Sequence, residues 1–146
     1  MTNTSDQTLR QLDALNSWLS DVYGEDTSVS TLLNTAGFSE VEIDQLKQEH
    51  LVALLQAVLD LLETYADLPN ESRNELMVLH YGLSDGKPQN LYHMGSSRGV
   101  CGERMRQLVN QRLNLYHDPD RQAQLHVDFA AIVRRLLLDD ESDSKV

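Results

Sequence analysis

The chain has 146 residues and a formal net charge of −11, and apolar residues make up 40% of it. This length fits one compact domain or two very small ones, with enough apolar residues for a core. The sequence contains no run of 18 apolar residues, so it predicts no transmembrane helix. Its polar, acidic start lacks the basic and apolar regions of a signal peptide. The single cysteine, Cys101, excludes an internal disulfide. We therefore expect a cytoplasmic protein without membrane contact.

The amino-terminal part of the sequence has the apolar spacing of amphipathic helices. A helix over residues 8–23 is predicted by apolar residues spaced by three and four, with Trp18 beside them: Leu9, Leu12, Leu15, Leu19 and Val22. A short helix is expected over residues 29–36, ending at Gly37. Ser39 followed by Glu42 forms a capping-box pattern, which predicts the start of a third helix.

The third helix is expected to run to about Ala66, with a break near residues 48–50. Leu68-Pro69-Asn70 then interrupts the helical pattern, because proline disfavours helix at the residue before it. We place the main boundary there. The predicted division is an acidic helical region over residues 1–67, a second helical region over 68–138, and an acidic tail over 139–146.

The second region predicts four more helices, over about residues 71–81, 91–97, 101–116 and 120–138. Turn residues over 82–88 predict a loop after the first of them, and Gly99 predicts a tight turn before the third. Asp118-Pro119 is a favourable start for the last helix, and the tail after it is expected to fray. The fold class is therefore all-α: a small helical bundle with a carboxy-terminal helix-turn-helix.

The charge is unevenly distributed along the chain. Residues 1–72 hold 13 acidic and 2 basic groups, whereas residues 73–121 hold 7 basic and 5 acidic groups, and residues 122–146 hold 5 acidic and 3 basic groups. The acidic total argues against nucleic acid as a partner. The middle segment is the one part of the chain whose net charge is positive.

That middle segment carries the most informative motif. The stretch LMVLHYGLSDGKPQNLYHMGSSRGVCGERMRQLVNQRLNLYHDP, residues 76–119, resembles region four of the bacterial primary sigma factors. Its loop Asp85-Gly86-Lys87-Pro88 and its helix Glu103-Arg104-Met105-Arg106-Gln107 look like that family's loop and recognition helix. Leu91, Gly95, Leu113 and Pro119 are also in register. The resemblance covers residues 71–119, roughly 50 residues in all, without a gap.

The resemblance implies a function in transcription. In that family the domain contacts promoter DNA and grips the flap of the RNA polymerase β subunit. Carried over to this chain, Glu103, Arg106 and Gln107 would read base edges, with Arg104 near the DNA backbone. The side-chain chemistry agrees, because arginine pairs bidentately with guanine, glutamine pairs with adenine, and glutamate accepts a hydrogen bond from cytosine.

The sequence also departs from the family pattern. Gly102 stands where the family usually has arginine, which removes a contact and weakens the start of the helix by about 1 kcal/mol. Arg98 and Arg112 replace a buried apolar residue and a small buried alanine, so each must pair or extend to solvent to avoid a cost of several kcal/mol. Asn114 and Leu115 occupy positions that are usually basic. Because phosphate contacts supply most nonspecific affinity, these changes predict weakened DNA binding.

Other candidate sites have simpler explanations. The five histidines lie on different predicted helices without the spacing of a metal site, so we predict no metal. Cys101 is interpreted as a small packing residue, although a helix start lowers a thiol pKa. The Gly82 to Lys87 segment lacks the spacing, hydroxyl residue and strand of a phosphate-binding loop. With no nucleophile and base, carboxylate pair or cofactor cradle, we predict neither an enzyme nor a bound cofactor.

Two hypotheses remain. The first is a transcription regulator that binds DNA, adapts RNA polymerase, or inhibits it by competing for the flap, while its acidic amino-terminal helices bind another protein. The second is a protein-interaction or assembly module that reuses a degenerate helix-turn-helix without binding DNA. The apolar stripes of the amino-terminal helices fit a core, and they equally allow a homodimer or partner interface. Outward-facing arginines on the helix over 101–116 would favour DNA, whereas their pairing with the acidic helices would favour protein contacts.

Overall fold

The computed structural model describes residues 6–24, 26–64 and 72–144, and within these ranges the chain forms helices and no strand. This confirms the predicted all-α class. The helices are α1 (Asp6–Tyr23), α2 (Val29–Thr35), α3 (Glu40–Glu49), α4 (Leu51–Thr64), α5 (Ser72–Tyr81), α6 (Leu91–Arg98), α7 (Gly102–Leu115) and α8 (Pro119–Ser144). No described helix has the length and apolarity that crossing a membrane requires.

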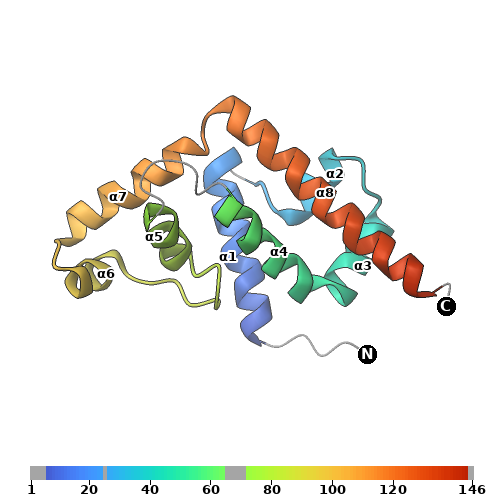
Figure 1. Ribbon diagram of the computed structural model, residues 1–146, viewed down its shortest axis with the longest axis horizontal. Helices are drawn as coiled ribbons and strands as arrows, with labels where there is room; N and C mark the ends of the chain where they lie inside the picture. The colour runs from blue at the N-terminus through green and yellow to red at the C-terminus, as the bar shows by residue number, and fades with distance from the viewer. Residues whose placement is uncertain (1–5, 25, 65–71, 145–146) are drawn as a thin grey trace.

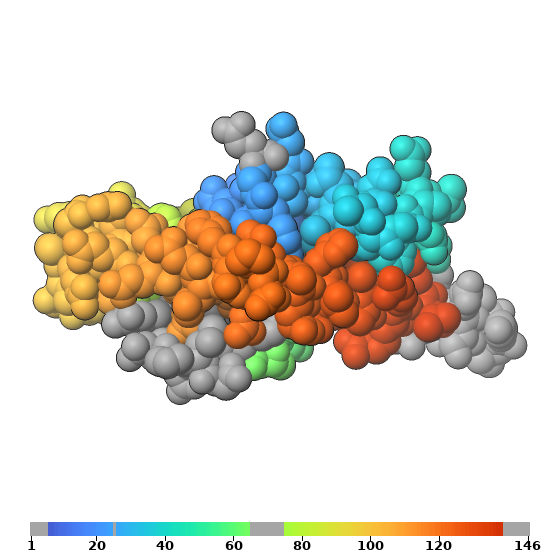
Figure 2. Space-filling view, turned by 90° about the horizontal axis from the view of Figure 1, so that it is seen from above, coloured from blue at the N-terminus to red at the C-terminus, as the bar shows by residue number. Residues whose placement is uncertain are grey.

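The arrangement of the helices separates two ends of the molecule. In Figure 1, α7 and α8 form the two arms of an inverted V, with α1 below the apex. Helices α2 and α3 lie behind the arm made by α8, whereas α6 lies at the tip of the arm made by α7. Seen from above in Figure 2, α7 and α8 follow one another along the length of the molecule. The α6–α7 end is therefore remote from α2 and α3.

Helix α1 matches the predicted helix over 8–23, but its buried face differs. Leu15, Trp18, Leu19 and Val22 are buried, whereas the side chain of Leu9 is 47% exposed. The prediction for Leu9 is wrong for a geometric reason. Leu9 and Leu15 are six residues apart. At about 100° per residue, their side chains point about 120° apart around the helix axis. Leu9 therefore lies to one side of the face that Leu15 occupies.

The predicted third helix is two helices. The capping box of Ser39 and Glu42 is confirmed, since the Ser39 side chain accepts a hydrogen bond from the Glu42 amide and the Glu42 side chain accepts one from the Ser39 amide. The chain then breaks at His50, where φ is −127° and ψ is 14°. This is the break expected near residues 48–50, and α4 begins directly after it. The end predicted near Ala66 lies outside the described residues.

One large core joins helices from both sides of the Leu68–Asn70 segment. Its most completely buried side chains come from α1, α2, α3, α4, α5 and α8, and from the turn after α7: Trp18, Leu19, Leu33, Leu46, Leu54, Leu62, Met77, Tyr116 and Phe129. Helix α8 supplies Leu125, Phe129, Ile132 and Val133 to this core. It continues to Ser144, six residues beyond the end predicted near residue 138, and the fraying of the tail stays a prediction. The division of the chain at residue 67 stays a prediction.

The carboxyl end of α1 is capped by side chains from distant parts of the chain. The last carbonyl groups of a helix have no partner within the helix. The ring of His117 lies 2.8 Å from the Asp21 carbonyl oxygen, and Gln122 donates to the Val22 carbonyl at 2.8 Å. Tyr23 in turn donates its hydroxyl proton to the Gln122 carbonyl at 2.7 Å. These bonds fix the start of α8 against the end of α1.

Candidate nucleic-acid interface

Helices α6 and α7 form a pair joined by the three residues 99–101. Asn90 caps α6, because its side-chain oxygen accepts hydrogen bonds from the amides of Tyr92 at 2.7 Å and His93 at 3.2 Å. Gly99 ends α6 with a φ of +73°, a conformation that favours glycine. The chain can therefore reverse within three residues and begin α7 at Gly102.

Two further glycines allow α6 and α7 to pack closely. A Cβ atom on Gly95 would lie 2.6 Å from the Val100 carbonyl oxygen, so the turn leaves no room for a side chain there. A Cβ atom on Gly102 would lie 3.2 Å from the Tyr92 Cα atom. Gly102 occupies a position where the resembled family usually has arginine. It lies where the start of α7 is close to the backbone of α6.

The pair rests on α5 through a small second core. Leu76 from α5, Met94 from α6, and Met105 and Val109 from α7 are its buried members. Next to Leu76, Met77 is buried in the large core instead, so α5 connects the two cores. Four buried side chains form a small core, and the position of α7 therefore depends on how α5 is held by the rest of the molecule.

The four residues predicted to read DNA lie together on the exposed side of α7. Glu103, Arg104, Arg106 and Gln107 are all exposed. Arg106 forms a bidentate ion pair with Glu103, with its Nε atom 3.1 Å from Oε2 and its second nitrogen bonded to Oε1. Arg104 donates to the Gln107 side-chain oxygen at 3.4 Å. The hydrogen bond from Arg106 lowers the pKa of the Glu103 carboxyl, and Glu103 raises the pKa of Arg106.

The arginines show a mixed pattern rather than either of the two patterns set out above. Arg98, Arg104 and Arg106 are exposed, and they bond to groups on α6 and α7 themselves. Arg98 is exposed and also donates to the Met94 carbonyl at 3.3 Å, so its charge is not buried. Arg112, by contrast, is 1% exposed. It lies on the inner face of α7, between Val109 of the small core and Tyr116 of the large one.

Cys101 does not have the predicted packing role. Its side chain is exposed, and it serves as the N-cap of α7, because the sulfur accepts a hydrogen bond from the Arg104 amide at 3.4 Å. Sequence patterns place serine, threonine, aspartate or asparagine at this position far more often, so cysteine gave no clear capping signal. The described residues bring together no three side chains that could hold a metal ion.

A contact that the sequence did not indicate joins α1 to the loop after α5. A Cβ atom on Gly86 would lie 2.7 Å from the Arg10 Cβ atom and 2.9 Å from the Gln7 carbonyl oxygen. Gln11 also donates to the Ser84 carbonyl at 2.8 Å. The turn residues predicted a loop here, but no local pattern specified which helix would cover it.

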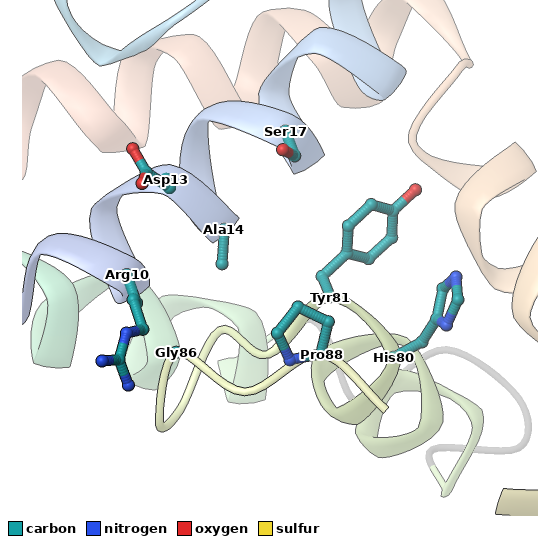
Figure 3. Close-up of a pocket in the computed structure, with 8 residues that line it drawn as sticks. All are labelled: Arg10, Asp13, Ala14, Ser17, His80, Tyr81, Gly86 and Pro88. Carbon is teal, nitrogen blue, oxygen red and sulfur yellow. The ribbon is translucent and has the colours of Figure 1, made fainter. Parts of the chain in front are cut away.

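Beside this contact lies an open cleft of about 500 Å³ between α1 and the α5 exit loop. Figure 3 shows Ala14 pointing from α1 toward Tyr81 and Pro88, with Arg10, Asp13 and Ser17 along the same helix. Tyr81 is held in place by donating its hydroxyl proton to the Asp21 carboxylate. The cleft is separate from the exposed row on α7, and both apolar and polar side chains line it.

Comparison with known proteins gives one informative match. The chain is 32% identical over 97 residues to the RNA polymerase sigma-C factor of Nostoc sp. (strain PCC 7120 / SAG 25.82 / UTEX 2576). The match covers 66% of this chain, which spans only 21% of the length of that relative. No protein-family profile and no solved structure matches the sequence. The chain therefore contains a region similar to part of a sigma factor.

Proposed function

We propose that this protein regulates transcription by placing α7 in the major groove of promoter DNA and by binding RNA polymerase. The observation that carries the proposal is the row of Glu103, Arg104, Arg106 and Gln107 on the exposed side of α7. The second helix of such a pair enters the major groove with its amino-terminal residues facing the base edges. The similarity to part of a sigma factor supports the same function.

The proposed readers have complementary chemistry. Gln107 matches adenine through paired donor and acceptor groups, and Glu103 accepts from the amino group of cytosine. Arg106 matches guanine bidentately, but its guanidinium is already paired with Glu103. Arg106 therefore has to exchange a partner on its own helix for a base, and this exchange reduces the net gain from DNA binding.

The charge distribution supports an end-on approach to DNA. Residues 86–117, which contain α6 and α7, hold five basic groups and one acidic group, so the remaining residues carry a formal charge of −15. Phosphates attract the α6–α7 end and repel the rest of the molecule. The duplex is thus contacted over a short length, and the resulting affinity is low without a second partner.

RNA polymerase is the second partner in this proposal. A protein that binds both DNA and polymerase gains affinity because the second contact becomes intramolecular. We assign the polymerase contact to the flap of the β subunit, as the sequence resemblance implies. We also propose that the acidic helices α1 to α4 bind a further protein. None of these helices carries an exposed row of basic side chains that would compete for DNA.

Two measurements on the same variants test the proposal. The first is fluorescence anisotropy of a mixed-sequence duplex at low salt, with wild type and an Arg104→Ala/Arg106→Ala double variant. The second is retention of RNA polymerase from a nuclease-treated lysate. We expect the double variant to bind the duplex at least tenfold more weakly and to retain polymerase. An Arg134→Ala/Arg135→Ala variant is the matched control, because both arginines are exposed on α8, away from α7.

A specific observation favours the alternative of a protein-interaction module. On α7, Arg106 is paired with Glu103 and Arg104 with Gln107, so the polar groups that would read DNA already satisfy one another. Under this alternative, wild type and the double variant bind the duplex equally weakly, and both retain the same protein partner after nuclease treatment. Equal duplex binding by both proteins would therefore exclude DNA readout by α7.

A further inference from the structure

A straight row of side chains extends the candidate interface along α7. At about 100° of rotation per residue, positions 103, 107, 110 and 114 fall within an arc of about 60°. The buried residues Met105, Val109 and Arg112 lie on the opposite side of the helix. Glu103, Gln107, Asn110 and Asn114 are all exposed, so they form the outermost line of α7.

The two asparagines in this row have no evident structural function. Asn110 and Asn114 lie inside a helix, where asparagine is a poorer former than the charged residues usual on helix surfaces. Two other asparagines have clear structural functions: Asn16 accepts a hydrogen bond from the Val29 amide, and Asn90 caps α6. Within the part of the chain that the structure describes, the side chains of Asn110 and Asn114 have no such bond. Their carboxamides are therefore available to a ligand.

The chemistry of the row selects the ligand. A carboxamide presents a donor and an acceptor side by side, which matches the N6 and N7 groups of adenine in the major groove. Asn110 lies about 4.5 Å beyond Gln107 along the helix axis, slightly more than the 3.4 Å between successive base pairs. Asn114 lies a further turn from the amino-terminal end that enters the groove. Asn110 is thus the better placed of the two.

We propose that Asn110 reads an A·T base pair next to the base pairs contacted by Glu103 and Gln107, and that it is a specificity-determining residue of this protein. This inference rests on the proposed function, because it requires α7 to enter the major groove. The inference goes beyond the proposed function because it adds a base-contacting residue about two helical turns from Glu103. It also predicts that the preferred site is extended by an A·T pair rather than by a G·C pair.

The test is selection from a pool of duplexes randomised over about one helical turn, carried out at low salt with the full chain. Wild type is compared with Asn110→Ala and Asn110→Asp, and Asn34→Ala, an exposed asparagine on α2, is the control. We expect wild type and Asn34→Ala to enrich adenine at one defined position. Asn110→Ala should lose about tenfold of this discrimination, and Asn110→Asp should favour cytosine there.

The outcomes separate this inference from the function on which it rests. If wild type enriches a sequence and Asn110→Ala enriches the same sequence equally, the assignment of Asn110 is wrong while DNA binding by α7 stands. If wild type enriches no sequence above the unselected pool, both are wrong. Circular dichroism of each variant checks that α7 is retained, and replacement of an exposed asparagine by alanine favours the helix.

Discussion

The ring of Trp18 meets the ring of Tyr116 edge to face, with centroids 5.2 Å apart and planes inclined at 76°. Both side chains are fully buried. The indole nitrogen of Trp18 also lies 3.2 Å from the Met77 sulfur. One side chain of α1 therefore contacts α5, which supports the α6–α7 pair, and Tyr116, where α7 ends. This connects the acidic amino-terminal helices to the position of the candidate interface.

The first prediction concerns this contact. Trp18→Ala removes the largest fully buried side chain and should lower the free energy of unfolding by about 3–5 kcal/mol. Urea unfolding followed by circular dichroism measures the change. Val41→Ala is the control, because the Val41 side chain is 76% exposed and its loss should change stability by less than about 0.5 kcal/mol. Equal effects of the two substitutions would contradict the described core.

The second prediction concerns the contact between Gly86 and α1. Gly86 and Gly99 have nearly the same positive φ, +74° and +73°, but only at Gly86 would a new Cβ atom meet the backbone of another helix. Gly99→Ala should therefore cost about 1–2 kcal/mol from the backbone conformation alone. Gly86→Ala should cost clearly more, because α1 and the loop have to separate. Thermal unfolding of the pair checks the order, and a smaller effect at Gly86 would be evidence against this docking.

The third prediction concerns alkaline pH. Burial raises the pKa of Tyr116 to about 12, with partial opposition from Arg112, and burial raises the pKa of Tyr23 to about 12. Burial and the bond to Asp21 also raise the pKa of Tyr81. An unfolded tyrosine titrates near pH 10, so between pH 10 and 12 the folded state keeps protons that the unfolded state has lost. Stability is therefore full below pH 10 and falls as pH rises toward 12.

Of these three tyrosines, Tyr116 is the one whose side chain is fully buried. It should account for about 2–3 kcal/mol of the loss across this window. Denaturant unfolding at pH values from 9 to 12 measures the profile. Tyr116→Phe should flatten it, while Tyr92→Phe, at a side chain that is 76% exposed, should not change it. A profile that Tyr116→Phe leaves unchanged would show that this ring does not control the alkaline transition.

The fourth prediction follows from the small number of exposed basic groups around α6 and α7. Lys87, Arg98, Arg104 and Arg106 are exposed there, so the logarithm of the DNA association constant should fall against the logarithm of salt concentration with a slope of about −3 to −4. Arg104→Ala should make the slope shallower by about 0.9. Anisotropy titrations over a series of salt concentrations give the slope. A slope unaffected by Arg104→Ala would place the phosphate contacts elsewhere.

The fifth prediction concerns the pair of Glu103 and Arg106. Glu103→Gln removes a negative charge that faces the proposed ligand and frees the Arg106 guanidinium. Binding to mixed-sequence DNA should therefore become tighter, and discrimination at the base pair that Glu103 contacts should decrease. Competition titrations with two duplexes that differ at one base pair measure both effects. Weaker binding by Glu103→Gln would mean that the ion pair itself orients α7 for binding.

Local patterns in the sequence predicted most helices, because apolar spacing, the Ser39–Glu42 capping box and Gly99 each depend on nearby residues. The resemblance to sigma region four, rather than a local pattern, selected Glu103, Arg104, Arg106 and Gln107; all four are exposed on α7, and their contact with DNA stays a prediction. The local patterns did not predict features that depend on contacts between segments distant in the sequence. The exposure of Leu9, the burial of Arg112 and the close contact at Gly86 all depend on which helix covers which face, and no local pattern contains that information.

The capping of α1 by His117 and Gln122 also affects how the chain is made. A nascent chain emerges amino terminus first, at roughly 5–20 residues per second. Trp18 is synthesised early, whereas Tyr116 and the two capping side chains follow nearly a hundred residues later. The contact between Trp18 and Tyr116 and the capping of α1 can therefore form only roughly 5–20 s after Trp18 is synthesised. Residues 1–72 hold 13 acidic and 2 basic groups, and this net charge favours solubility of the chain during that interval.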